Sequence, residues 1–161
     1  MRKKNLYKNA KAKRDGGAFF TVPAAVLNGA AYIGLNAHAR MLLFDLLAQY
    51  NGSNNGDLGV AFSLMKPRGW RSEHTLLDAK RDLLEAGLIV ETRKGARPNK
   101  ASLYAVTWHA LDECDGKLDI STQSFPRGAY KSKDRPKVVI DAVSAAIENT
   151  SLTAPSASRP L

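Results

Sequence analysis

Residues 62–75 read Phe62-Ser-Leu-Met-Lys-Pro-Arg-Gly-Trp-Arg-Ser-Glu-His-Thr75. They are the beginning of the stretch that decides the fold. The sequence predicts that a helix begins within residues 62–66, and Pro67 can fall within its first turn. A proline is tolerated there because the first helical N–H groups have no partner inside the helix. Residues 69–71 then predict a tight turn.

A second helix is predicted to begin after Ser72, whose hydroxyl can cap it by accepting from the N–H of Thr75. Gly87 ends the helical pattern. At 100° per residue, one broad sector is apolar and consists of Leu76, Leu77, Ala79, Leu83, Leu84 and Ala86. The opposite side is polar and consists of His74, Asp78, Arg81 and Glu85, with Thr75 and Asp82 flanking it.

Two β-prone segments follow, residues 88–92 and 102–108, with a basic loop over residues 93–101 between them. A short strand at residues 58–61 is expected to join this hairpin in a three-stranded sheet. Two helices, a tight turn and a basic hairpin are the parts of a winged helix-turn-helix. The predicted fold is therefore α+β, with a three-helix core, a small antiparallel sheet and the hairpin as the wing.

Upstream, Pro23 can occupy the first position of a short apolar helix that Asn28-Gly29 ends. Phe19 and Phe20 before it are interpreted as core or dimer contacts. Asn36 can cap a longer helix that ends at residues 50–52. The apolar face of that helix is predicted to consist of Met41, Leu42, Phe44, Leu46 and Leu47.

The net charge of +9 is carried by the ends of the chain, because residues 35–116 hold ten basic and ten acidic side chains. We expect a flexible basic arm at residues 1–17 and one domain at residues 18–116. Residues 117–161 are expected to be a mostly disordered polar tail with a short helix at residues 138–149. Basic arms suit a polyanionic partner, although a surface charge that only confers solubility is the alternative.

Nothing in the sequence indicates catalysis, so we expect no enzyme activity, no cofactor and no metal site. The three histidines lack metal-ligand spacing, and there is no phosphate-binding or dinucleotide-binding motif. Cys114 lies among acidic residues, which raise a thiol pKa, and it is the only cysteine. A lone cysteine, no signal segment and no membrane-spanning run favour a cytoplasmic location without a membrane partner.

The DNA-contacting residues that we predict fall into three groups. The turn and second helix contribute Lys66, Arg68, Arg71, Ser72, Glu73, His74, Thr75, Asp78 and Arg81. The wing contributes Arg93, Lys94, Arg97 and Lys100. The arm contributes Arg2, Lys3, Lys4, Lys8, Lys11, Lys13 and Arg14, as a weaker electrostatic contact.

Alternatives remain open for each group. The carboxylates of the helix repel phosphates, so they contact cytosine amino groups, orient Arg81 or lie outside the contact. Arg81 can also pair with Asp78 or Glu85, and His74 can be a plain surface residue. The wing can be a solvated loop, and the arm a tail without a partner.

Three segments, residues 54–58, 65–72 and 83–89, resemble winged-helix proteins encoded by bacterial phages, plasmids and integrated elements. The step from helix to Gly87-Leu88-Ile89 is also similar to the N-terminal DNA-binding domains of phage replication proteins. The resemblance covers about residues 19–116. It implies a winged-helix fold and binding to duplex DNA.

The sequence thus predicts a sequence-specific binder of double-stranded DNA, acting as a transcriptional regulator of a mobile element. One alternative is an accessory protein of replication initiation or partition that binds an origin and recruits a protein through its C-terminal tail. Another is a winged helix that binds only protein. A homodimer is compatible with each, with Phe19, Phe20 and residues 138–149 as candidate contacts.

Overall fold

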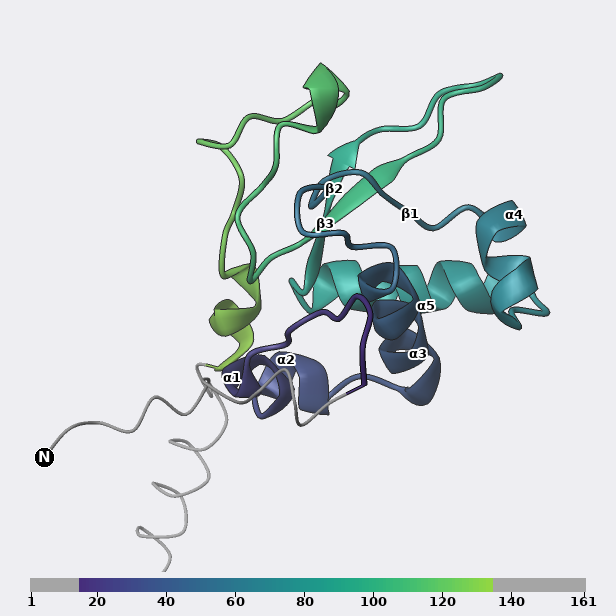
Figure 1. Cartoon of the computed structure of the whole chain (residues 1–161). Helices are drawn as coiled ribbons and strands as arrows, with labels where there is room; N and C mark the ends of the chain where they lie inside the picture. Colours follow the sequence, from purple (N-terminus) through teal and green to yellow (C-terminus); the bar gives the residue numbers. More distant parts are fainter. Residues whose placement is uncertain (1–14, 135–161) are drawn as a thin grey trace, which may run out of the picture.

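The computed structural model describes residues 15–134, and the predicted basic residues of the arm and the helix at residues 138–149 lie outside this range. Helices α3 and α5 pack against each other below a three-stranded antiparallel sheet of order β1-β3-β2 (Figure 1). The α+β class and the three-stranded antiparallel sheet are therefore confirmed. The elements in chain order are α1 Ala24–Leu27, α2 Ala30–Ile33, α3 Ala37–Leu47, β1 Leu58–Gly59, α4 Phe62–Met65, η2 Lys66–Arg68, α5 Glu73–Glu85, β2 Ile89–Arg93, β3 Leu103–Val106, η3 Cys114–Gly116 and η4 Ala129–Asp134.

The N-terminal helices differ from the prediction in two ways. Pro23 is the residue before α1 rather than its first residue, and a second short helix, α2, follows after Gly29. Phe20 packs edge-on against Phe44, with the ring centroids 6.2 Å apart. Phe19, in contrast, is 59% exposed, so the core prediction is wrong for this side chain.

The predicted cap of α3 is confirmed, because the Asn36 side chain accepts from the N–H of Ala39 at 2.8 Å. Leu42, Leu46 and Leu47 are buried as predicted, together with Leu43. The predicted apolar face is wider than the buried one, however, since Met41 and Phe44 are exposed on the outer side of the helix. The helix ends at Leu47, a little earlier than predicted.

The short helix α4 ends at Met65, and Pro67 lies after it in the 3₁₀ turn η2 rather than in its first turn. Gly69 then adopts a positive φ of 99°, which an L side chain disfavours, and so reverses the chain. The cap of α5 is confirmed, with Ser72 Oγ accepting from the N–H of Thr75 at 3.2 Å.

The buried side of α5 is narrower than the apolar sector predicted for it. Leu76, Ala79 and Leu83 are fully buried against α3 and the inner face of the sheet. Leu77 is 47% exposed, because it lies at the edge of that sector. An exposed leucine on this helix is therefore available to a partner.

A buried side chain extends the pairing between β1 and β3. The backbone pairing covers Leu58 with Tyr104 and Gly59 with Leu103, so β1 is shorter than predicted. Beyond it, Asn55 accepts from the N–H of Val106 at 2.8 Å and donates to the carbonyl of the same residue at 3.0 Å. Asn55 is fully buried and also donates to the Ala110 carbonyl at 2.8 Å. The amide group therefore takes the place of a strand backbone.

Residues 117–134 are not the disordered tail that the sequence predicts, and the predicted domain boundary at residue 116 is not seen. Phe125 and Leu111 are buried against Ala105, on the outer face of the sheet. Tyr130, in η4, is buried in the main core beside α2. The segment packs on the sheet through these side chains and then returns to the N-terminal helices (Figure 1). Both faces of β3 are therefore covered.

Candidate nucleic-acid interface

A buried carboxylate fixes the turn between α4 and α5. Asp45 on α3 is 8% exposed and accepts from Arg68 Nε and from Trp70 Nε1, each at 2.7 Å. Arg68 is thus tied to the domain, although 43% of its side chain stays exposed. Lys66 and Arg71, on either side of it, are exposed. The turn therefore presents two exposed cations on an anchored backbone.

The exposed face of α5 is organised around Asp78. Its carboxylate lies 3.0 Å from His74 Nδ1 and 2.9 Å from Arg81 Nη2. Of the roles left open for this carboxylate, the geometry favours the one that orients Arg81. Such exposed pairs stabilise a helix by only about 0.3–0.5 kcal/mol, so the guanidinium can exchange this partner for another at little cost.

The remaining predicted residues of the turn and helix have different surroundings. Ser72 is engaged as the helix cap, and Thr75 is half-buried beside it. Glu73 is exposed at the positive end of the helix dipole. Over its whole length α5 carries four acidic side chains and two basic ones, so the helix itself is acidic.

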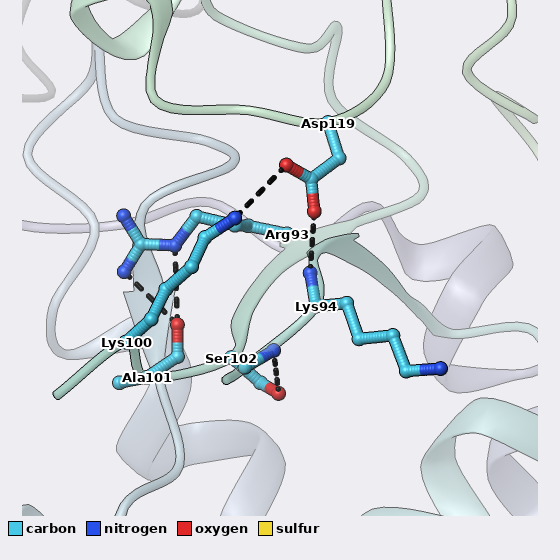
Figure 2. A network of polar contacts seen from close by, with 7 residues as sticks. Arg93, Lys94, Lys100, Ala101, Ser102 and Asp119 are labelled. Carbon is cyan, nitrogen blue, oxygen red and sulfur yellow. Dashed lines mark hydrogen bonds and ion pairs between the residues drawn. The ribbon is translucent and has the colours of Figure 1, made fainter. Parts of the chain in front are cut away.

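The base of the hairpin is a polar cluster that includes a residue from the C-terminal segment (Figure 2). Asp119 accepts from the backbone N–H of Lys94 at 2.7 Å and from Lys100 Nζ at 3.3 Å. Arg93 donates from Nε and Nη2 to the Ala101 carbonyl at 3.1 and 2.9 Å. Two of the four predicted wing cations are thus engaged within the protein.

The other two wing cations are available to a partner. The Lys94 side chain extends away from Asp119 (Figure 2) and is exposed. Arg97 lies at the exposed tip, where Ala96 and Lys100 exchange two backbone hydrogen bonds of 2.8 Å. The tip is therefore an ordered, cationic turn.

The hydrogen bonds to Asp119 lower the pKa of its carboxyl group. The N–H of Lys94, and then the Lys100 ammonium and the nearby Arg93, lower the pKa of this carboxyl group below its ordinary value. Asp119 therefore remains a carboxylate at neutral pH. Its backbone is held separately, because its N–H donates to the Thr92 carbonyl at 2.8 Å.

A groove runs between α5 and the hairpin, and the sequence prediction missed the cation that lines it. Lys80 and Leu77 border a cavity of about 190 Å³, with Ala101 and Ser102 opposite. The helical spacing of Glu73, Leu77 and Lys80 was a signal in the sequence, because residues three and four apart share one side of a helix, and here that side falls within the apolar sector.

These parts lie on one side of the molecule. The hairpin projects on the side where α4 and the beginning of α5 lie (Figure 1), and residues from all three line the groove. The turn, the exposed face of α5 and the hairpin tip therefore form a surface flanked by cations. We call this surface, made by residues 66–81 and 93–102, the α5–hairpin surface.

Three further observations concern possible metal ligands, the thiol of Cys114 and the length of the helices. Within residues 15–134, no group of three or more His, Cys, Asp or Glu could hold a metal ion. Burial, followed by Asp57 and Asp112, raises the pKa of Cys114, in the direction that its acidic neighbours predict. No helix in the described part of the chain is long and apolar enough to cross a membrane.

Comparison of the chain with protein-family models, with curated proteins and with solved structures finds no match. The functional argument therefore depends on the geometry of the α5–hairpin surface.

Proposed function

We propose that the chain is a winged helix-turn-helix protein that binds double-stranded DNA sequence-specifically. The order α3, β1, α4, turn, α5, β2, hairpin, β3 supports this assignment, because α4 and α5 then form the helix-turn-helix and residues 93–103 form the wing. The biological process that we favour is transcriptional regulation of a mobile element. Control of replication or partition is the alternative that the sequence resemblance also suggests.

The observation that carries the proposal is the placement of exposed cations on the two segments that lie beside the N-terminal part of α5, the turn and the hairpin. Lys66 and Arg71 lie at its N-terminal end, and Lys94 and Arg97 lie on the hairpin. In helix-turn-helix proteins a helix enters the major groove while flanking groups contact the phosphates. The cations of the turn and hairpin are placed to contact phosphates, and the mixed polar groups of α5 are placed to contact bases.

The side chains of α5 suit contacts with base edges better than bulk attraction to phosphates. Arg81 has the planar fork that pairs with the O6 and N7 atoms of guanine. His74 Nδ1 lies 3.0 Å from Asp78, so the other ring nitrogen, Nε2, is left to contact a base edge. The helix is acidic overall, so its contribution is selectivity, and the turn and hairpin contribute affinity.

The proposal is tested by selection from a random duplex library, followed by fluorescence anisotropy of the selected duplex over a salt series. We expect enrichment of a defined site, binding at least about 10³-fold tighter than to unrelated duplex, and a linear fall of log K with log salt. Heparin serves as the control polyanion. Binding to heparin as tight as to the selected duplex would contradict the proposal.

A second candidate, a protein-interaction module, is favoured by the acidic balance of α5 and by the exposure of Leu64 and Leu77. Leucine side chains add nothing to the attraction of phosphates, but they are common in protein interfaces. Replacement of Leu64 by serine discriminates between the candidates, because Leu64 is exposed and lies outside the α5–hairpin surface. It should leave DNA affinity unchanged under the first proposal and abolish partner binding under the second.

A further inference from the structure

The carboxylate of Asp119 occupies a site with the character of an oxyanion-binding site. One oxygen accepts from the backbone N–H of Lys94 at 2.7 Å, and the other contacts the Lys100 ammonium at 3.3 Å. The guanidinium of Arg93 lies close enough to contribute to the lowered pKa of the carboxyl group. A backbone N–H and an ammonium group are also the donors that proteins use for DNA phosphates.

We propose that this site at the base of the hairpin binds a phosphate group of duplex DNA, and that Asp119 fills it in the free protein. The proposal rests on the DNA-binding function proposed above. It adds a specific phosphate contact, made by Lys94 N–H and Lys100 Nζ, and a residue of the C-terminal segment that competes with the phosphate for that contact.

The local anchoring permits the exchange. The Asp119 N–H donates to the Thr92 carbonyl, which fixes the backbone. Leu118 and Ile120 on either side pack against the cluster of Ala105, Leu111 and Phe125 on the outer face of the sheet. The side chain itself is 46% exposed, so it can rotate away while the segment stays in place. The Lys100 side chain is 45% exposed, so a phosphate can approach it from solvent.

The energetic cost of the exchange is small. An exposed ion pair contributes little in water, because solvent and salt screen it. A phosphate carries the same charge as the carboxylate and offers more acceptor oxygens to the same donors. Because the pKa of Asp119 is lowered, protonation does not vacate the site near neutral pH. The exchange is therefore controlled by phosphate and not by pH in that range.

The test measures binding of the full chain to a labelled random-sequence duplex, since phosphate contacts do not depend on sequence. Asp119→Asn keeps an acceptor for the Lys94 N–H but removes the charge that competes for Lys100. We expect tighter binding, by up to about fivefold, the most that loss of one exposed ion pair allows. We also expect a salt slope steeper by up to about 0.9, the value of one phosphate contact, because the phosphate no longer has to displace a carboxylate from Lys100.

The matched control is Asp57→Asn, which makes the same charge change at the exposed pair of Asp57 with Lys117, 2.8 Å apart. Its effect on affinity and slope should be smaller than that of Asp119→Asn. The double variant Asp119→Asn with Lys100→Ala should lose the gain in affinity and slope that Asp119→Asn gives, because the released ammonium is then absent.

The two proposals fail in different ways. If the wild-type chain does not bind duplex, the proposed function is wrong and this inference with it. If the wild-type chain binds but Asp119→Asn matches Asp57→Asn, or binds more weakly with an unchanged slope, the carboxylate only holds the hairpin. The phosphate site is then refuted while DNA binding stands.

Discussion

Replacement of Asp45 by alanine should destabilise the protein strongly and loosen the turn that carries Lys66 and Arg71. Asp45 is 8% exposed, and its two oxygens accept from Arg68 and Trp70 at 2.7 Å. The substitution leaves Trp70 Nε1 buried without an acceptor, since Trp70 is only 3% exposed. An unsatisfied buried donor is costly, and hydrogen bonds to a charged acceptor are among the stronger ones.

The magnitude follows from this geometry. Removing one partner of a buried ion pair costs about 3–5 kcal/mol. The Arg68 side chain is 43% exposed, so water replaces part of what it loses, and we expect about 3 kcal/mol. Asp45→Asn should cost less, about 1–2 kcal/mol, because an amide oxygen can still accept from Trp70.

Urea unfolding, followed by circular dichroism and tryptophan fluorescence, measures the change in the free energy of unfolding. The control is Asp57→Ala, which removes an exposed pair and should cost less than about 1 kcal/mol. If Asp45→Ala and Asp57→Ala destabilise equally, the buried pair does not anchor the turn, and the account of how the candidate surface is positioned is wrong.

Three further predictions concern other parts of the fold. Asn55→Ala should cost about 3 kcal/mol in urea unfolding, because it removes three side-chain hydrogen bonds, two to Val106 at the end of β3 and one to Ala110; a cost below about 1 kcal/mol would contradict this role. In the same assay, Gly87→Ala should destabilise the protein by about 2–3 kcal/mol and Gly69→Ala by only about 1 kcal/mol. Both glycines have a positive φ, but of the two only Gly87 would place its new Cβ against backbone atoms, 3.0 Å away. Equal costs would show that this contact is not tight. Cys114 should react with iodoacetamide near neutral pH more slowly than in the urea-unfolded chain, because burial raises its pKa; an equal rate would contradict the shift.

Local signals in the sequence identified most of the middle of the chain. The caps at Asn36 and Ser72, the helical spacing of α5 and the strands around the basic loop each depend on neighbouring residues. Each of these features was therefore accessible without any knowledge of tertiary contacts. The joining of β1 to the hairpin was expected instead from the arrangement of strands in winged-helix folds.

The covering of the sheet by residues 117–134 was not predicted, for a physical reason. Leu118, Ile120, Phe125 and Tyr130 are separated by polar residues at no regular spacing, so the segment has no periodicity. Its order comes from long-range contacts such as the bond from Gly128 N–H to the Thr107 carbonyl, 2.7 Å long. Such contacts leave no local pattern in a single sequence.

The same limit applies to the candidate site. Composition identified the cations of the turn and hairpin but not their partners, because Asp45 is 23 residues from Arg68 and Asp119 is 19 residues from Lys100. The ion pair of Arg81 with Asp78 was accessible from helical spacing alone. The structure thus divides the predicted cations into those with partners inside the domain and those exposed to an outside partner.

The central claim is that α5 selects the sequence while the hairpin contributes affinity. Its most direct test is the affinity of Arg81→Ala, and of Lys94→Ala combined with Arg97→Ala, for every single-base-pair variant of the selected duplex. We predict that Arg81→Ala relaxes the preference at one base pair, by about 1–3 kcal/mol. The double variant should weaken all duplexes alike and lower the salt slope by about 0.9 per lost phosphate contact. An unchanged preference in Arg81→Ala, or a changed preference in the double variant, would contradict the claim.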